Sequence, residues 1–279
     1  MRRALVTGAS SGIGEATAKL LATEGYSVAL LARRREPLDA VLEVLASSTR
    51  SSSPAAEGAG SPEASHYVVT CDMTDSSSIA AAAKSLAENF GTIDLVVCNA
   101  GVGYRAKIEE LDDDLLDRVF ATNALGPMRL ARELLPTLRK SDRPVWINVS
   151  SVVGRRGIPG QAAYSATKAA LGSFGEALRL EWASEGKNGI AVCTLNPALT
   201  ATGFFEAQPN PGDLPKPDMA GAAGPMDVAS EILALDKQPE PERSLRWKWW
   251  LLGALTPIFP RLSDRMLAKK LGGGWKAPR

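Results

Sequence analysis

The chain has 279 residues, 45% of them hydrophobic, which is long enough for one α/β domain to bury a large core. The 32 Lys and Arg nearly balance the 31 Asp and Glu, so the net charge of +1 gives no global field for nucleic acid or anionic surfaces. Each of the three cysteines lies at or near the end of an apolar run, which predicts buried reduced thiols in a cytoplasmic protein. The single histidine, His66, has no ligand cluster around it, and no metal is expected. No signal peptide fits before the first predicted strand, and no apolar stretch reaches membrane-spanning length.

Short apolar runs alternate with helical patterns along the chain. Strands are predicted at 3–7, 27–31, 66–70, 94–98, 144–149 and 190–195, and helices at 12–24, 36–46, 76–89, 112–139 and 161–185. The fourth helix is interrupted by Gly126-Pro127, which is also compatible with two helices. Strands separated by helices predict an α/β fold, a doubly wound parallel sheet with helices on both faces. Ligands bind such sheets at the carboxyl ends of the strands.

The first predicted strand ends in a glycine-rich turn. Leu5-Val6-Thr7-Gly8-Ala9-Ser10-Ser11-Gly12-Ile13-Gly14 is followed by a run of Ala, Leu and Glu at helical period. Glycines permit a tight turn and close approach of a pyrophosphate, and the start of the next helix brings N–H groups and a positive dipole end. Strand, glycine turn and helix together predict a dinucleotide site.

A second cluster lies in the predicted helix 161–185. Tyr164 and Lys168 are four residues apart, so they lie on one face of a helix, and Ser151 lies upstream. A phenol is a weak acid, with a usual pKa of about 10. A nearby cation favours the phenolate, so we expect Lys168 to lower the pKa of Tyr164. This arrangement suits a phenol that gives and takes a proton during catalysis.

From residue 3 to about 235 these features resemble the short-chain dehydrogenase/reductase family, the branch with a Thr-Gly-x-x-x-Gly-x-Gly turn. The resemblance implies that Asp72 contacts the adenine, that Ser151 is the catalytic serine rather than Ser150, and that Asn123 holds a water. The implied catalytic residues are Asn123, Ser151, Tyr164 and Lys168. The implied cofactor-binding residues are Gly8, Ser10, Ser11, Gly12, Ile13, Gly14, Arg33, Arg34, Asp72, Met73, Asn99, Ala100, Gly101, Tyr164, Lys168, Pro197, Thr200 and Thr202.

The resemblance implies an NADP(H)-dependent oxidoreductase that interconverts a carbonyl and a secondary or primary alcohol. Tyr164 is the expected proton donor or acceptor, with Lys168 on the nicotinamide ribose. One departure is Ala198, where the family has Gly after Pro197; its methyl is expected to narrow the pocket. The alternative is a dinucleotide-binding regulator or scaffold without turnover, because fold does not imply function.

The end of the second strand predicts the cofactor. Enzymes that use NAD usually place an acidic residue there, to bond the ribose hydroxyls. Here the strand ends at Ala32, and Arg33, Arg34 and Arg35 follow. A guanidinium matches phosphate oxygens, so the sequence predicts NADP(H), and the family resemblance implies that Arg33 is the NADP-selecting residue.

We expect a single domain over 1–279, with three segments outside the repeating pattern. Residues 47–65 are rich in Ser, Ala, Gly and Pro and are expected to form a flexible insertion, whereas 203–225 are expected to be a substrate-loop lid. The extension 243–279 is apolar and rich in Trp; its Arg246-Trp247-Lys248-Trp249 stretch predicts an edge strand. Packing in the core or on a partner subunit is the preferred interpretation of the extension, and membrane-surface contact is the alternative. The resemblance implies a homodimer or homotetramer through the helices at 112–139 and 161–185.

Overall fold

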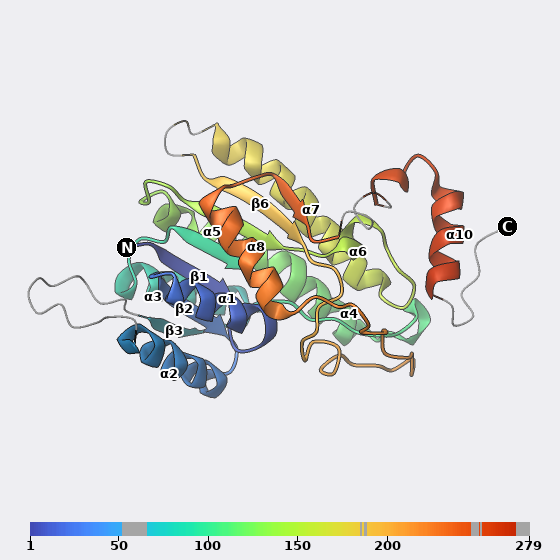
Figure 1. The fold of residues 1–279 in the computed structure, drawn as a ribbon, viewed down its shortest axis with the longest axis horizontal. Helices are drawn as coiled ribbons and strands as arrows, with labels where there is room; N and C mark the ends of the chain where they lie inside the picture. The colour runs from blue at the N-terminus through green and yellow to red at the C-terminus, as the bar shows by residue number, and fades with distance from the viewer. Residues whose placement is uncertain (52–65, 185, 187–188, 247–250, 252, 272–279) are drawn as a thin grey trace, which may run out of the picture.

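The computed structural model describes residues 1–51, 66–184, 186, 189–246, 251 and 253–271. Within them seven parallel strands form one sheet in the order β3-β2-β1-β4-β5-β6-β7 (Figure 1). The strands are β1 Arg3–Thr7, β2 Ser27–Ala32, β3 Tyr67–Thr70, β4 Leu95–Cys98, β5 Val145–Val149, β6 Ala191–Asn196 and β7 Glu242–Ser244. Strands β1 to β3 are added toward one edge of the sheet and β4 to β7 toward the other, so the strand order switches between β1 and β4. Ligands bind at such a switch point in open α/β sheets.

Helices connect the strands and cover both faces of the sheet. They are α1 Gly12–Thr23, α2 Arg35–Ser51, α3 Ser76–Asn89, α4 Asp113–Phe120, α5 Gly126–Leu138, α6 Val152–Arg155, α7 Ala162–Ala183, α8 Pro225–Lys237 and α10 Pro260–Leu271. A 3-10 turn η1, Ile108–Glu110, precedes α4, and a π-helical turn η2, Ala121–Leu125, joins α4 to α5. None of the described helices combines the length and the apolar character that crossing a bilayer requires.

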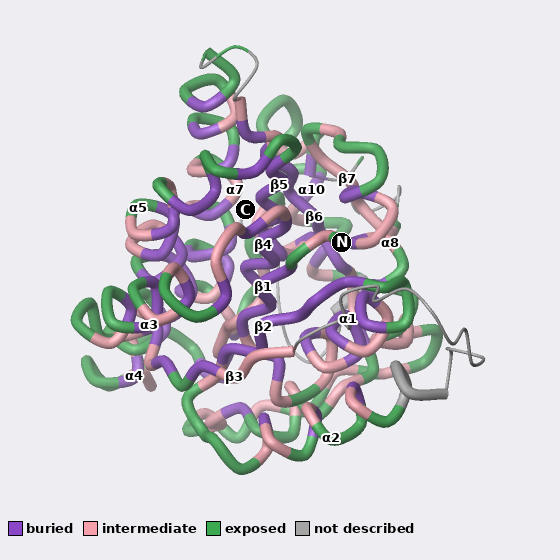
Figure 2. The backbone as a smooth tube through the Cα atoms, turned by 90° about the vertical axis from the view of Figure 1, so that its left-hand side faces the viewer, coloured by how far each residue is buried: buried purple, intermediate pink, exposed green. Residues whose placement is uncertain are grey.

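Alternate residues of the central strands enter two separate cores. In β1, Ala4 and Val6 pack with the buried side chains of α1, α2 and α8, whereas Leu5 packs with those of α3, α5 and α7. Figure 2 shows the buried strands between these two helical layers. Because both faces are covered, β4 and β5 are buried along their whole length, as is usual for parallel sheets.

All six strands predicted from the sequence are confirmed, each end lying within one residue of its prediction. The predicted helix 112–139 is in fact α4, η2 and α5, with α5 starting at Gly126. The prediction that the second helix stops at 46 is wrong, because α2 continues to Ser51. The edge strand expected at 246–249 falls mostly on residues 247–250, which lie outside the described part; the described edge strand is β7.

A buried carboxylate in α8 binds the two residues that directly precede β1 and β2. Asp236 in α8 is fully buried; it binds the Arg2 guanidinium at 2.5 Å and accepts a hydrogen bond from the Tyr26 hydroxyl at 2.6 Å. Burial and this carboxylate raise the pKa of Tyr26 to about 12. Losing one partner would leave a buried charge unpaired, which costs far more than losing a surface pair.

Replacing Asp236 by Ala is expected to lower the free energy of unfolding by about 3 kcal/mol, the low end for opening a buried ion pair, because Arg2 keeps some contact with water. Urea denaturation measures this. The control is Lys237→Ala, which removes an exposed ion pair with Glu24 at the same helix end and should cost less than about 1 kcal/mol. Equal losses in the two variants would contradict the assignment.

Candidate active site

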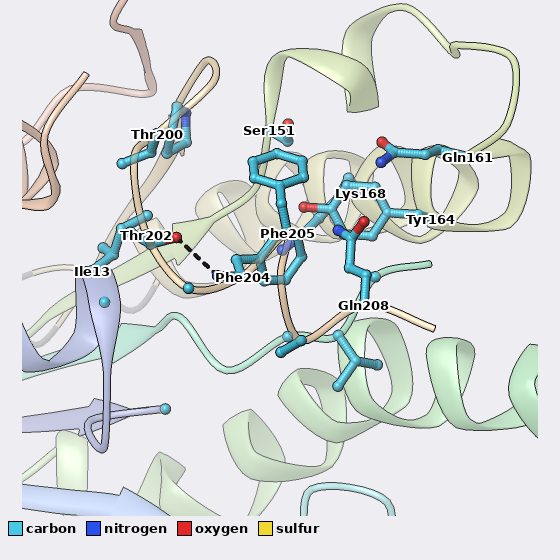
Figure 3. A pocket seen from close by; sticks show the side chains of 18 of the residues that line it. Ile13, Ser151, Gln161, Tyr164, Lys168, Thr200, Thr202, Phe204, Phe205 and Gln208 are labelled. Carbon is cyan, nitrogen blue, oxygen red and sulfur yellow. Dashed lines mark hydrogen bonds between the residues drawn. The ribbon is translucent and has the colours of Figure 1, made fainter. Parts of the chain in front are cut away.

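One cavity of about 1280 Å³ opens at the carboxyl end of the sheet and brings together most of the predicted site. Its walls include Ser151, Tyr164 and Lys168 on one side and the glycine-rich turn on the other (Figure 3). The predicted residues that line it are Gly8, Ser10, Ser11, Gly12, Ile13, Arg33, Arg34, Asp72, Met73, Asn99, Ala100, Gly101, Ser151, Tyr164, Lys168, Pro197, Thr200 and Thr202. Only Gly14 and Asn123 are absent from its walls.

The glycine turn leaves no room for side chains at its tightest point. A Cβ on Gly14 would lie 2.2 Å from the carbonyl oxygen of Gly8, so α1 can approach β1 this closely only with glycine there. Gly12 has a φ of +58°, the left-handed region that favours glycine. Gly14 therefore allows the close packing of α1 on β1 without lining the cavity, while Gly8 and Gly12 line it.

Asp72 and Asn99 follow the ends of β3 and β4. The Asp72 carboxylate accepts hydrogen bonds from the backbone N–H and the hydroxyl of Thr74, at 2.9 and 2.8 Å. The Asn99 side chain donates to the carbonyl oxygen of Thr7 at 3.0 Å. Both side chains thus fix loop geometry as well as lining the cavity.

The three arginines after β2 are not equivalent. Arg35 is paired with Asp39 one helical turn later, at 2.8 Å, and does not line the cavity. Arg33 and Arg34 are exposed and do line it, and neither has a hydrogen bond or ion pair within the described residues. Two unpaired guanidinium groups therefore lie where an anionic group could approach.

Ser151 and Tyr164 meet inside the cavity. Ser151 is the N-cap of α6, where its hydroxyl accepts from the backbone N–H of Val153 at 3.3 Å. Burial raises the pKa of Tyr164 above its usual 10, and a hydrogen bond with Ser151 offsets only part of that increase. The expectation of a lowered pKa for Tyr164 is therefore wrong in the absence of ligand, because the desolvation of the buried phenol raises this pKa by more than its neighbours lower it. The phenol is therefore neutral at physiological pH.

Lys168 is almost fully buried at the end of the sheet. Its ammonium donates to the carbonyl oxygen of Val149 at 2.9 Å and lies 5.8 Å from the centre of the Tyr164 ring. Burial lowers its pKa to about 8. Of its three N–H donors, one has an acceptor among the described residues, so two remain for a ligand in the cavity. The neighbouring Ser150 is occupied instead, since its hydroxyl donates to the Lys168 carbonyl oxygen.

Asn123 lies behind the cavity wall, in the π-helical turn η2. Its side-chain oxygen accepts from the N–H of Val102 at 2.8 Å, and its nitrogen donates to the carbonyl oxygen of Val102 and to the hydroxyl of Thr167. A Cβ on Gly101 would lie 3.3 Å from Asn123 and 3.6 Å from the Lys168 ammonium. In this structure Asn123 therefore holds the chain after β4 beside Lys168.

The short chain dehydrogenase family matches residues 2–211. The chain belongs to this family of oxidoreductases. An uncharacterized oxidoreductase of Staphylococcus aureus is 32% identical over 237 residues, covering 85% of this chain and 91% of its own. The glycine betaine reductase ATRR of Emericella nidulans is 33% identical over 242 residues, but this chain spans only 18% of that protein.

Solved structures agree with the fold. An alcohol dehydrogenase from Thermococcus sibiricus, complexed with 5-hydroxy-NADP, superposes with a TM-score of 0.73 at 28% identity, covering 88% of this chain and 96% of its own. A short-chain dehydrogenase from Sphingobium yanoikuyae, in complex with NADPH, gives 0.74 at 25% identity, covering 93% and 96%. Both confirm the Rossmann-like α/β fold predicted from the strand and helix pattern.

The loop after β6 forms the remaining wall of this short-chain dehydrogenase cavity. Thr202 packs against the glycine turn, its side chain 3.3 Å from the position of a Cβ on Gly12, and accepts from the N–H of Phe204 (Figure 3). Phe204 lies 5.9 Å from the Tyr164 ring, centre to centre. Gln208 is buried in the wall, and neither polar atom of its amide has a partner within the described residues.

The sequence located this loop but not Phe204 or Gln208, because irregular backbone has no periodicity that distinguishes inward from outward side chains. Ala198, expected to narrow the pocket, does line the cavity, as do Val153 and Gln161. Tyr104 does not line the cavity: it is fully buried, and its hydroxyl accepts a hydrogen bond from the N–H of Ala163 at 2.7 Å. No group of three metal-ligating side chains occurs in the part of the chain that the structure describes.

The lowered pKa of Lys168 predicts a pH dependence of stability. Between about pH 8 and 10.5 the folded protein has released this proton and the unfolded chain has not, so folding is stabilised as the pH rises. As the pH rises through this range, the free energy of unfolding of the wild type should therefore increase by about 3 kcal/mol relative to that of Lys168→Met. Urea denaturation at several pH values measures it. Lys84→Met, which removes an exposed lysine, is the control; an equal pH dependence there would contradict the assignment.

Proposed function

We propose that this protein is an NADP(H)-dependent oxidoreductase that interconverts a carbonyl with a secondary or primary alcohol by hydride transfer. One observation carries the proposal: Ser151, Tyr164 and Lys168 open onto the same cavity as the glycine turn. A proton donor and a dinucleotide cradle sharing one space can serve a reaction between cofactor and substrate. A cradle alone could serve only binding.

The residues present fit a dinucleotide phosphate. The backbone of the glycine turn faces the cavity without intervening side chains, and Arg33 and Arg34 lie unpaired on its wall. No acidic residue stands at Ala32, so a 2′-phosphate next to these guanidinium groups meets no repulsion. Two structural relatives were crystallised with 5-hydroxy-NADP and NADPH, which supports the same cofactor class here.

Each side chain has a distinct part in the proposed reaction. The bound nicotinamide supplies or takes up the hydride. Tyr164, whose pKa burial raises further above physiological pH, is in the protonated form that gives a proton to a carbonyl oxygen. Ser151 holds that oxygen and stabilises the charge that develops on it. Lys168 offers its two remaining donors to the ribose hydroxyls.

The substrate enters next to the loop after β6. Phe204 and Phe205 give this part of the cavity aromatic walls, and the amides of Gln161 and Gln208 are among the polar groups that line it (Figure 3). The Ala198 methyl lies on the same wall, where glycine would leave more space. We infer that the substrate combines an apolar body with hydrogen-bonding groups near the reacting carbonyl.

Tyr164→Phe should reduce turnover about 10²–10⁴-fold, the usual contribution of general acid–base catalysis, because the ring remains and only the hydroxyl is lost. NADPH affinity and the unfolding midpoint should stay near wild type. Oxidation of NADPH, followed by absorbance over a panel of ketones and aldehydes, measures turnover. Tyr67→Phe removes a hydroxyl far from the cavity, on β3, and serves as the control.

Retention of more than about a tenth of the activity in Tyr164→Phe would refute the proton-transfer role. Absence of turnover by the wild type on every carbonyl and alcohol, together with tight NADPH binding, would favour the alternative of a dinucleotide-binding regulator. A regulator of that kind has no need of the hydroxyl of Ser151 next to Tyr164.

Arg33→Ala should erode selectivity for the phosphorylated cofactor. A hydrogen bond to a charged group contributes about 1.5–3 kcal/mol, which predicts a roughly ten- to hundredfold preference of the wild type for NADPH over NADH. The variant should lose most of that ratio while its Kd for NADH changes little. Titration of both cofactors measures it, with Arg34→Ala as the parallel variant.

Arg35→Ala is the matched control for cofactor selectivity, because Arg35 is paired with Asp39 and does not line the cavity. Its ratio of affinities should equal that of the wild type. Equal wild-type affinities for NADPH and NADH would overturn the proposal on cofactor choice. So would an unaltered ratio in both Arg33→Ala and Arg34→Ala.

A further inference from the structure

An unusual concentration of exposed apolar side chains lies at the C-terminal end of the described chain. Of thirteen large hydrophobic residues that are exposed in the described part, six fall within residues 251–266. They are Leu251, Leu255, Ile258, Phe259, Leu262 and Met266. The other seven belong to the N-terminus and to six separate elements between α2 and α8. The core-packing part of the expectation for this extension is therefore wrong for these six residues, and packing on a partner subunit stays a prediction.

On α10 the apolar residues lie next to a row of cations. Leu262 and Met266 are one turn apart, and both are more than half exposed. Arg261, Arg265 and Lys269 form a second exposed row at the same four-residue spacing, adjacent around the helix. Long basic side chains beside an apolar row can bring their charges to a polar boundary while their stems cover apolar surface.

Contacts with the body hold the opposite side of α10. Arg156 makes an ion pair with Asp264 and donates to the hydroxyl of Ser263 at 3.0 Å. Ser263 and Leu267 are both buried. Figure 1 shows α10 at one end of the molecule, apart from the sheet. The apolar and basic rows are therefore fixed in an outward orientation, with Asp264 neutralised by Arg156.

The net charge of +1 hides a strong asymmetry along the chain. Residues 245–279 contain eight Lys and Arg and one acidic residue, Asp264, a charge of +7. The first 244 residues therefore carry −6, because the whole chain carries +1. A segment that is both basic and apolar is typical of helices that lie on anionic membrane surfaces.

We propose that the six exposed apolar residues and the basic row Arg261, Arg265 and Lys269 form a docking surface for an anionic phospholipid bilayer, with α10 lying in the interface. A bilayer offers acyl chains to the apolar row and phosphates to the adjacent cations. Self-association of two copies through the same surface would instead bring two rows of Arg261, Arg265 and Lys269 together, which is unfavourable. The proposal is independent of the reaction in the cavity, since none of these residues lines it.

Co-sedimentation of the full chain with vesicles tests the proposal. The wild type should pellet with vesicles of phosphatidylglycerol and phosphatidylcholine in equal parts and remain in solution with phosphatidylcholine alone, and added salt should weaken the binding. Leu262→Gln with Met266→Gln should lose most binding without lowering the unfolding midpoint, because both side chains are exposed. The control, Leu180→Gln with Met226→Gln, removes two exposed apolar side chains elsewhere and should bind like wild type.

A charge variant tests the electrostatic part separately. Replacing Arg261, Arg265 and Lys269 by Gln should weaken binding to the anionic vesicles about a hundredfold, from three basic groups near the surface. Failure of the wild type to pellet with anionic vesicles would overturn the proposal. So would an equal loss in the control. Retained vesicle binding in the Leu262 and Met266 variant, together with a smaller solution mass, would instead assign the surface to contact between copies of the chain.

Discussion

The site is built around a hydrogen-bonded junction between the two central strands. The hydroxyl of Thr7, the last residue of β1, accepts from the backbone N–H groups of Asn99 and Ala100, both at 2.9 Å. The Asn99 amide returns a hydrogen bond to Thr7 and lies 2.8 Å from where a Cβ on Gly14 would stand. One hydroxyl and one amide thus fix the glycine turn, the first helix and the chain leaving β4 relative to one another. Because these groups are buried or nearly so, removing one would leave others unsatisfied, and the cavity wall would lose its shape.

A second constraint, on the other side of the cavity, is the burial of an ammonium. Lys168 is held by Val149 at the end of β5, and the π-helical turn places Asn123 beside it, across Gly101. Single π-helical turns are frequent at functional sites, because the wider turn changes which side chains face inward. The same desolvation that keeps the phenol of Tyr164 protonated lowers the proton affinity of Lys168. One environment therefore moves the two groups apart in proton affinity: their ordinary pKa values, 10.0 and 10.5, are nearly equal, and burial raises that of Tyr164 while lowering that of Lys168.

Local chemistry explains which features the sequence could predict. Strands β1 to β6 are short apolar runs bounded by turns, and the glycine turn and the Tyr164–Lys168 pair are contiguous motifs, so all could be located without a structure. The π-helical turn could not, because Ala121–Leu125 reads as ordinary helix and only tertiary contacts of Asn123 distinguish it. The raised pKa of Tyr164 was missed for a related reason: helical spacing identifies a neighbouring cation but not the burial that outweighs it. Buried wall residues such as Gln208 lie on irregular backbone, where no pattern marks the inward side.

The three cysteines have a consequence for how the molecule meets electrophiles and oxidants. Cys71, Cys98 and Cys193 are all buried and free, and burial raises the pKa of each thiol, to about 11 for Cys71 and Cys193. Since the thiolate is the reactive form, the folded protein offers almost no reactive sulfur. Cys98 shows this most clearly: the positive charge of Lys168 favours its thiolate, but burial has the larger effect and keeps the pKa of the thiol raised. The three native cysteines therefore need not be removed before labelling. A single cysteine introduced on the surface of the folded protein would be the one thiol open to a thiol-directed label.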